Sequence, residues 1–408
     1  MRIADEKDNK KGERMNLTKK VGTLLTSALL LHLVGCGQQA QEPLRIGATM
    51  SQTGAYQTQG QAARNGYLLC EQDLNAAGGL LGRPVEFVVY DDESSQERAR
   101  ALYEQLISVE QVDAIMGPYG STLTEAVAPI TEKHRYVHIS PLAATSSIWE
   151  QGRHHLFMVL PPADVFLAGL INMAEQHGYQ RVAVLYEDAL FPAAAAQGAI
   201  DLATSKGMDV VFQQAYTSGT EDFRSYLSDI ATAETQVLAL AASALTNFVT
   251  ITQQLKELDI NVQLMGTSGA VDEFQHALGA DADYVMGLSA WEASVPLPGS
   301  EQFVRNYQAR FQRAPSFHAA GAYGSCQLLA HAITSAGSLN SDAIRDVLLN
   351  LEMTTVFGPF AVDKRGYQTA HQGVFVQWQD GEKRVIWPHE QAVSEPRITM
   401  PTWSERAN

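Results

Sequence analysis

The feature that most constrains the fold is a regular alternation of short apolar segments with longer segments of helical spacing. Leu44–Met50 and Val85–Tyr90 have strand-like composition, whereas Ala62–Ala77 and residues 95–109 repeat apolar side chains at the spacing of one helix face. No hairpin signal joins one strand to the next. This order predicts an α/β fold with a parallel sheet, helices on both faces and a ligand outside the carboxyl ends of the strands.

The alternation starts again after Leu160-Pro161-Pro162, where two prolines stiffen a segment that crosses between lobes. The expected strands of this second lobe are 181–186, 209–213, 236–240 and 263–266, with helices near 165–177, 193–206, 223–231 and 246–258. A strand at 284–289, helices at 303–311, 319–335 and 341–349, and a hairpin at Asp380-Gly381 follow. A chain of 408 residues is long enough for two such lobes.

Two strand exits in the first lobe carry hydroxyl groups. A strand at Val112–Met116 is stopped by Gly117-Pro118, and the next helix begins near Ser121 and Thr122. Unpaired amides and the helix dipole favour an anion at such a helix start. The following strand ends at a similar exit, Ser140–Thr145. We therefore expect a ligand carboxylate to bind at these two exits. The alternative is that these hydroxyls only cap helices.

The sequence offers no pattern that would support catalysis. Asp91-Asp92 is interpreted as a strand-end loop, since neighbours on an extended chain face opposite ways and no spaced metal-ligand pattern follows. The histidines are scattered, and no HExxH motif or Cys-His cluster occurs. We therefore predict that the protein is not an enzyme and uses no cofactor or metal ion.

The first 35 residues have the character of a secretory signal. Lys19-Lys20 precedes the apolar run Val21–Val34, and Met1–Arg14 looks like the product of a start codon assigned too early. Leu33-Val34-Gly35-Cys36 resembles a bacterial lipobox, which predicts lipidation of Cys36 and a polar tether at 37–43. The alternative is an ordinary secretory signal with a chance cysteine.

Charge limits the classes of binding partner, and the few cysteines limit the possible disulfides. Lys and Arg total 29 against 45 Asp and Glu, and removing residues 1–35, with seven basic and four acidic groups, changes the net charge from −16 to −19. Such acidity argues against nucleic acid or an anionic membrane surface as a partner. Besides Cys36 only Cys70 and Cys326 occur, and we expect two separate buried thiols rather than a disulfide.

The ordered motifs resemble those of the leucine/isoleucine/valine-binding proteins of bacterial ABC importers. The matching segments, in order, are Asn75-Ala76-Ala77-Gly78-Gly79, Leu81-Gly82-Arg83, Asp91-Asp92, Gly117-Pro118 with Ser121, and Ile139-Ser140-Pro141. The resemblance implies a type I periplasmic binding protein fold, in which two doubly wound parallel-sheet lobes are joined by a three-stranded hinge.

The resemblance also divides the chain. The expected parts are a signal segment at 1–35, a lipidated cysteine and tether at 36–43, a first lobe at 44–161 plus 292–372, a second lobe at 162–291 plus 373–390, and a C-terminal tail at 391–408.

The resemblance further implies a site between the lobes. Ser121 takes the place of the family's carboxylate-binding serine, and Ala143 or Ala144 with Thr145 forms the second exit. The acid that normally pairs with the ligand's ammonium is replaced by Thr267-Ser268, so either Asp188, Asp272 or Glu292 substitutes or the ligand is not an ordinary α-amino acid. Tyr56 is a further aromatic candidate, and the predicted ligand-binding residues are Ser121, Thr122, Ala143, Ala144, Thr145, Tyr119, Phe191, Ser243, Ser268 and Trp291.

The function implied is capture of an amino acid or related small carboxylated molecule and its delivery to an ABC permease. The partners would be permease and ATPase subunits, and the membrane would be contacted only through the lipid on Cys36, in the periplasm or another extracytoplasmic compartment. Two alternatives remain open: a binding protein that reports its ligand to a chemoreceptor or kinase, and a lipoprotein without ligand that binds a cell-wall enzyme.

Overall fold

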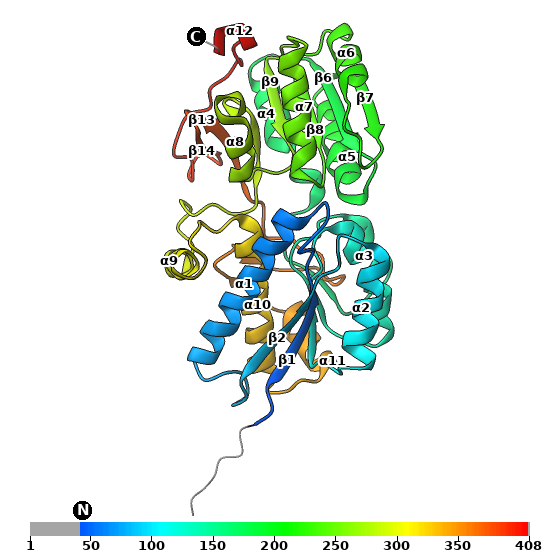
Figure 1. Cartoon of the computed structure of the whole chain (residues 1–408), viewed down its shortest axis with the longest axis vertical. Helices are drawn as coiled ribbons and strands as arrows, with labels where there is room; N and C mark the ends of the chain where they lie inside the picture. The colour runs from blue at the N-terminus through cyan, green and yellow to red at the C-terminus, as the bar shows by residue number, and fades with distance from the viewer. Residues whose placement is uncertain (1–40, 407–408) are drawn as a thin grey trace, which may run out of the picture. The chain divides into compact units, whose positions relative to one another are not determined.

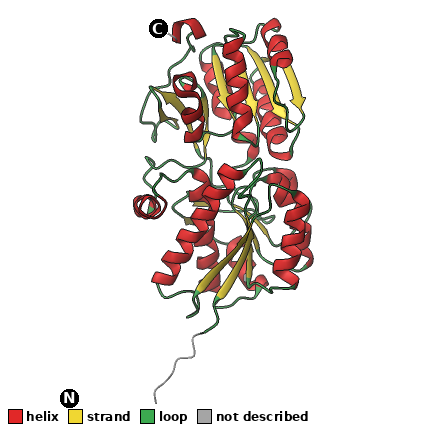
Figure 2. Cartoon of the chain, viewed as in Figure 1, coloured by secondary structure: helices red, strands yellow, loops and turns green. Residues whose placement is uncertain are grey.

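The computed structural model describes residues 41–406, which belong to one compact unit (Figures 1 and 2). Two sheets organise it. The first sheet has the order β2-β1-β3-β4-β5, and its strands are β1 Leu44–Thr49, β2 Val85–Tyr90, β3 Ala114–Met116, β4 His138–Ser140 and β5 Leu156–Met158. The second has the order β14-β13-β10-β9-β8-β6-β7, and its strands are β6 Arg181–Glu187, β7 Asp209–Tyr216, β8 Val237–Ala241, β9 Leu264–Thr267, β10 Met286–Ser289, β13 Val374–Gln379 and β14 Glu382–Trp387. A small ladder joins β11 Met353–Thr354 to β12 Pro359–Phe360.

Helices surround each sheet, and each sheet with its helices is called a lobe below. The first lobe has α1 Gln57–Ala76, α2 Gln96–Ser108, α3 Ser121–Lys133, α9 Ser300–Phe311, α10 Phe317–Ala336 and α11 Ser341–Leu349. The second lobe has α4 Ala168–Gln176, α5 Leu190–Ser205, α6 Arg224–Thr232, α7 Leu245–Glu257 and α8 Asp272–Leu278, and α12 Trp403–Arg406 follows near the C-terminus. In the first lobe α1 packs beside α10, and α2 beside α3 (Figure 1).

Strand alternation in β1 explains why the first sheet is covered on both faces. Ile46 and Ala48 enter the large core that includes α1 and α10. Gly47 faces the other way, where an added Cβ would lie 2.9 Å from Val112 and 3.1 Å from Leu106. The absence of a side chain at Gly47 lets α2 approach the sheet closely, and a separate core forms there between α2, α3 and β3.

The predicted parallel sheets and the predicted hairpin are confirmed. All strand pairs of the first sheet are parallel, and β10, β9, β8, β6 and β7 are parallel in the second. β13 is antiparallel to β10 and β14, and Asp380 and Gly381 turn the hairpin with φ of 53° and 76°, as a tight turn requires. The elements that the sequence did not predict are short: β5, α8, the β11–β12 ladder and α12, none longer than seven residues.

Three segments connect the lobes, between β5 and α4, between β10 and α9, and between β12 and β13. The residue bounds proposed for the lobes stay a prediction. The segment expected as a tail packs on the second lobe, because Met400 N donates to Gln263 O and Trp403 Nε1 donates to Ile260 O, both at 2.8 Å. Within residues 41–406 no helix has the length and apolar character needed to cross a bilayer.

The expectation of two separate thiols was wrong. Cys70 on α1 and Cys326 on α10 form a disulfide across 256 residues of sequence, with Cα atoms 6.4 Å apart. Each cysteine was correctly placed in a buried helix, but the packing of α1 on α10 brings the two side chains together. That packing joins the two ends of the first lobe and leaves no local signal in the sequence.

Candidate functional site

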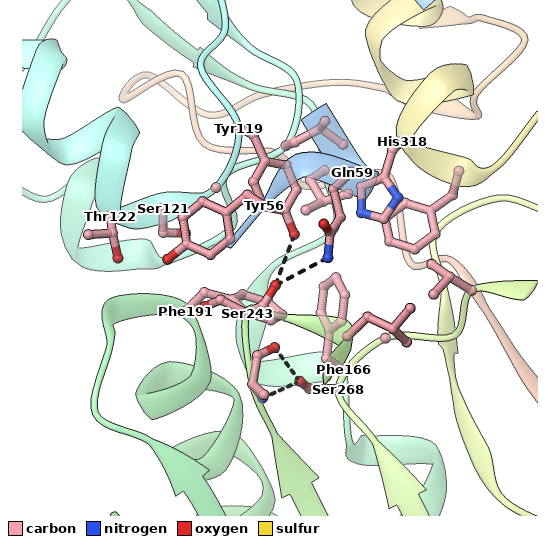
Figure 3. A pocket seen from close by; sticks show the side chains of 18 of the residues that line it. Tyr56, Gln59, Tyr119, Ser121, Thr122, Phe166, Phe191, Ser243, Ser268 and His318 are labelled. Carbon is pink, nitrogen blue, oxygen red and sulfur yellow. Dashed lines mark hydrogen bonds between the residues drawn. The ribbon is translucent and has the colours of Figure 1, made fainter. Parts of the chain in front are cut away.

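A cavity of about 70 Å³ lies between the lobes, near the carboxyl ends of strands from both sheets (Figure 3). The first lobe and the first crossing segment contribute Tyr56, Gln59, Tyr119, Gly120, Ser121, Thr122, Leu123, Leu142, Leu160, Phe317 and His318. The rest of the lining is Phe166, which precedes α4, and Phe191, Ala242, Ser243, Leu245, Phe248, Ser268, Gly269 and Val271 of the second lobe. Most of these side chains are aliphatic or aromatic.

On the first-lobe wall, the start of α3 carries the main polar group. Ser121 is 2 % exposed, and its Oγ accepts hydrogen bonds from the amides of Ala144 at 3.1 Å and Thr145 at 3.2 Å. A hydroxyl has two acceptor sites and one donor hydrogen. Both acceptor sites are used by these amides, and no described residue accepts the hydrogen, so Ser121 has a donor available for a ligand oxygen.

Backbone amides add to this donor capacity. Gly120 precedes α3 with φ of 77°, and as a glycine it has no side chain to cap the helix. The first helical hydrogen bond runs from Thr124 N to Gly120 O at 3.1 Å. The amides of Ser121, Thr122 and Leu123 have no acceptor within residues 41–406. An uncapped helix start of this kind attracts an anion through its free N–H groups and the helix dipole.

On the second-lobe wall, the polar groups are already engaged with one another. Glu187 is 5 % exposed and accepts from Ser243 N at 2.8 Å and from Ser218 Oγ at 2.6 Å. Ser268 Oγ accepts from Ala242 N at 3.2 Å. These bonds tie the loops after β7 and β8 to the end of β6 and the loop after β9 to the loop after β8, so this wall presents mainly apolar surface to the cavity.

Two side chains of the first wall contact the same carbonyl of the second wall. Tyr119 Oη and Gln59 Nε2 both donate to Ser243 O, each at 3.4 Å (Figure 3). Both distances are at the long end for hydrogen bonds, so these contacts are weak. Aromatic rings pack around them, with Tyr56 against Tyr119 at 5.3 Å between centroids and Phe166 against Phe191 at 5.0 Å.

The cavity lining has no formal charge. It contains no Asp, Glu, Lys or Arg. Burial raises the pKa of Tyr119, and burial with the nearby Glu187 raises the pKa of Tyr56, so both hydroxyls stay protonated. Burial lowers the pKa of His318 to about 3, with a further contribution from Lys383, so its imidazole is neutral at ordinary pH.

None of the acids proposed as ammonium partners lines the cavity. Glu292 and Asp272 lie 2.7 and 3.1 Å from Lys383 Nζ, whose side chain is 9 % exposed. Burial alone would lower the pKa of Lys383, but the two carboxylates outweigh burial and raise it. Asp188 is exposed and lines a neighbouring hollow between the lobes.

That outer hollow adjoins the cavity, since Tyr56, Thr122 and Leu123 line both. Thr145 lines it as well. Its Oγ1 is buried and has no hydrogen-bond partner among the described residues. Thr145 and Ser121 therefore both lie between the lobes. Ser121 lines the cavity, and Thr145 lines the outer hollow.

The structure places six of the ten predicted residues on the cavity: Ser121, Thr122, Tyr119, Phe191, Ser243 and Ser268. Three others lie elsewhere. Ala143 and Ala144 are buried in the core, and only the Ala144 amide reaches the site, through Ser121. Trp291, which was predicted to contact the ligand, packs edge-on against Phe303 of α9 at 5.7 Å and does not line this cavity. Its ring turns toward the first lobe because the chain crosses there to α9.

Sequence reasoning did not identify Gln59, Phe166, Phe317 or His318. Gln59 and His318 lie at the starts of α1 and α10, far apart in sequence. Phe166 follows the Pro161-Pro162 segment, which was recognised only as a crossing. The one available signal was that each of these residues lies close to a predicted boundary between elements.

No metal site is evident in the described part of the chain. Between residues 41 and 406 no group of three or more His, Cys, Asp and Glu side chains is arranged to hold a metal ion. Asp91 and Asp92 instead brace the loop before α1, where Asp92 accepts from Thr49 Oγ1 and Ser51 Oγ, and Asp91 accepts from Gln52 N. Cys36 lies outside the described residues.

Residues 43–383 match the family described as Periplasmic binding protein, so the chain belongs to that family. A Brucella suis relative named Leu/Ile/Val-binding protein homolog 7 is 23% identical over 380 residues, covering 88% of this chain and 95% of the relative. The expected fold class is thereby confirmed.

Solved structures of related proteins have a similar fold. LivJ from Streptococcus pneumoniae, a branched-chain amino acid transporter substrate-binding protein in complex with isoleucine, has a TM-score of 0.75 at 23% identity, covering 84% of this chain and 98% of LivJ. An ABC transporter solute-binding protein from R. palustris in complex with benzoate has a TM-score of 0.77 at 17% identity, covering 88% and 97%.

Proposed function

We propose that this protein is an extracytoplasmic solute-binding protein, not an enzyme, that captures a small apolar monocarboxylate between its lobes and delivers it to an ABC permease. The observation that carries the proposal is the contrast inside one cavity. A hydroxyl and three amides without acceptors gather at the start of α3, while the rest of the lining is neutral and largely apolar.

The start of α3 suits a carboxylate. Ser121 can donate its hydroxyl hydrogen to one carboxylate oxygen, and the amides of Ser121, Thr122 and Leu123 offer further N–H donors. Hydrogen bonds to an ionised acceptor are about twice as strong as neutral ones. Because the donors are fixed by the helix and by the Ala144 and Thr145 amides, little ordering is needed when the ligand binds.

The lack of an acid in the lining argues against a zwitterionic ligand. An ammonium buried here would lose its hydration without gaining a counter-charge, which costs several kcal/mol. Glu292 and Asp272 are held by Lys383. The benzoate complex of the R. palustris protein provides a parallel in this fold, since benzoate has a carboxylate and a ring but no ammonium.

The cavity size implies that the lobes move when a ligand enters. An engineered cavity of about 150 Å³ holds one benzene ring, and this cavity measures about 70 Å³. A ring-sized ligand therefore requires the walls to separate. The contacts from Tyr119 and Gln59 to Ser243 O are weak enough to be exchanged for contacts with the ligand.

An amino acid is the second candidate ligand, and the outer hollow favours it. There the unpartnered Thr145 hydroxyl and the exposed Asp188 could face an ammonium, while the carboxylate still binds at Ser121. This arrangement would place the charged amino group near solvent rather than in the apolar cavity.

A thermal-shift screen separates the two candidates. Purified residues 37–408, which include the whole compact unit, are tested with matched pairs that differ only by the ammonium, such as 3-phenylpropionate with L-phenylalanine and 4-methylpentanoate with L-leucine. A ligand at 100 times its Kd stabilises by about 2.7 kcal/mol. We expect the larger shift from the acids without an amino group. A larger shift from the amino acids would favour the second candidate, and no shift from any carboxylate would refute the proposed function.

Anchoring and delivery are further parts of the proposal, supported by the lipobox-like sequence at Cys36 and by family membership. Cys36→Ser is expected to abolish radiolabelled fatty-acid incorporation, and a strain lacking the protein is expected to lose uptake of the identified ligand. Normal uptake with a lost chemotactic or kinase response would favour the sensing role instead.

A further inference from the structure

The end of the cavity opposite Ser121 and Thr122 has its own polar groups. In Figure 3 Ser121 and Thr122 lie on one side, His318 lies on the other, and Gln59 is beside His318. His318 is the second residue of α10, and its ring is fixed by stacking on Phe317 at 3.9 Å and by Tyr119 at 5.5 Å. The positions of both polar ends are therefore set by the first lobe.

His318 and Gln59 have unused hydrogen-bonding capacity. His318 is 5 % exposed, yet neither ring nitrogen bonds to any of residues 41–406. Gln59 is 6 % exposed, its only bond is the long contact to Ser243 O, and its Oε1 accepts from no described residue. These free atoms are not fully enclosed by protein, so a ligand group in the cavity can reach them. Two adjacent side chains with free capacity on a cavity wall point to a ligand group.

The chemical nature of the ligand group follows from the charge of the two side chains, which are both neutral. Burial and Lys383 lower the pKa of His318 to about 3, so the ring has one N–H donor and one acceptor nitrogen. The Gln59 amide likewise has a donor and an acceptor. A hydroxyl both donates and accepts, and it carries no charge that would need a counter-ion. An ammonium or a second carboxylate would find no opposite charge in the lining.

We propose that His318 and Gln59 select ligands that carry a hydroxyl group at the end opposite the carboxylate. The inference rests on the proposed function, because it takes the carboxylate to lie at Ser121. It narrows the substrate class to apolar hydroxycarboxylates, of which hydroxylated aromatic acids fit a lining rich in aromatic rings.

The test compares hydroxyl ligands with methyl analogues of nearly the same size. The probes are 4-hydroxybenzoate, 4-hydroxyphenylacetate and 3-(4-hydroxyphenyl)propionate, each paired with its 4-methyl counterpart and titrated by calorimetry into residues 37–408. The protein is expected to prefer at least one hydroxyl ligand by about 10-fold or more, because the methyl analogue leaves His318 and Gln59 unpaired.

Substitutions test whether His318 and Gln59 cause the preference for hydroxyl ligands. His318→Phe and Gln59→Leu are expected each to reduce the hydroxyl-to-methyl affinity ratio, and His318→Asn, which retains a donor and an acceptor, is expected to keep most of it. His331→Phe is the matched control, because His331 is exposed on the same helix α10 and should leave the ratio unchanged.

The outcomes distinguish failure of the hydroxyl preference from failure of the proposed function. If carboxylates bind but the ratio is near one in every pair, or if the ratio survives in His318→Phe, the inference is wrong and the proposed function stands. Tighter binding of terephthalate than of 4-hydroxybenzoate would also overturn it, because the far end would then prefer an anion. If no carboxylate binds, the proposed function fails and the inference fails with it.

Discussion

The two walls of the cavity use similar residues for opposite purposes. Ser121 on the first lobe and Ser268 on the second each accept hydrogen bonds from neighbouring loop amides. Ser121 accepts two amides and has its hydrogen left for a ligand, whereas Ser268 Oγ can also donate to Ala242 O at 3.5 Å. The first wall therefore retains donor capacity, and the second wall uses its polar groups internally.

This difference assigns separate tasks to the lobes. In the proposed complex the first lobe would hold the ligand at both ends, through the start of α3 and through His318 and Gln59. The second lobe would cover the ligand with apolar surface, while Glu187 and Asp272 are engaged within the protein. A cover without free charge is suited to ligands that lack an ammonium.

The largest effect is expected from Lys383→Met. It should lower the free energy of unfolding by about 3–5 kcal/mol, because Glu292, whose side chain is only 15 % exposed, would lose its ion-pair partner. Urea denaturation measures the change, and Lys383→Met with Glu292→Leu should recover most of the loss. Lys256→Met is the matched control, since the pair with Asp281 is more exposed and worth at most about 1 kcal/mol. Equal losses in the two single variants would show that the Lys383 cluster is not a structural element.

Ser121→Ala is expected to weaken carboxylate binding by roughly 10- to 100-fold, since a hydrogen bond to a charged group is worth about 1.5–3 kcal/mol. It should also lower stability, because the amides of Ala144 and Thr145 lose their acceptor. Calorimetric titration with the best monocarboxylate measures the affinity. Ser268→Ala is the matched variant on the other wall, where we expect a comparable stability loss with little change in affinity. Equal affinity losses would contradict the division of tasks.

Acid is expected to destabilise the first lobe through buried histidines. Burial lowers the pKa of His138 to about 4 and that of His318 to about 3, both below the unfolded value of 6.5. Between pH 6.5 and 4 the unfolded chain binds protons that the folded chain does not, so the free energy of unfolding falls as pH falls, by up to about 1.4 kcal/mol per pH unit for each histidine.

His138→Gln tests this linkage. It should reduce the slope of unfolding free energy against pH by about one proton, whereas His154→Gln should not, because His154 is exposed. Urea denaturation at several pH values between 4.5 and 7.5 gives the slopes. An unchanged slope in His138→Gln would show that this ring is not held neutral by burial.

The smallest effect is expected from Trp291→Phe. Trp291 lies outside the cavity, and its Nε1 has no hydrogen-bond partner in the described part of the chain. Ligand affinity should therefore change by less than about 2-fold, since no contact with the ligand is lost. Calorimetry with the same monocarboxylate checks this, and a large loss would restore Trp291 to the site.

The sequence placed Ser121 and Thr122 correctly at a strand exit and helix start, because that end of the cavity is formed by neighbouring residues. A strand stopped by Gly117-Pro118 and a helix start with Ser121 and Thr122 are adjacent in the chain, so their geometry follows from short-range rules. The parallel sheets followed in the same way from the alternation of strands and helices. Phe191, Ser243 and Ser268 were found because each follows a strand of the second sheet.

The remaining features depend on packing between distant segments. The packing of α1 on α10 creates the Cys70–Cys326 disulfide. His318 and Gln59, at the starts of these same two helices, likewise come together only in the folded lobe. Trp291 was expected at the ligand but does not line the cavity, because the direction of its ring depends on where the chain crosses to α9.

The most direct test of the central claim is a crystal structure of residues 37–408 with the monocarboxylate that gives the largest thermal shift. The account predicts one carboxylate oxygen about 2.5–2.7 Å from Ser121 Oγ and the other facing the amides at the start of α3. A carboxylate bound by the second lobe, with Ser121 Oγ contacting only Ala144 and Thr145, would contradict it.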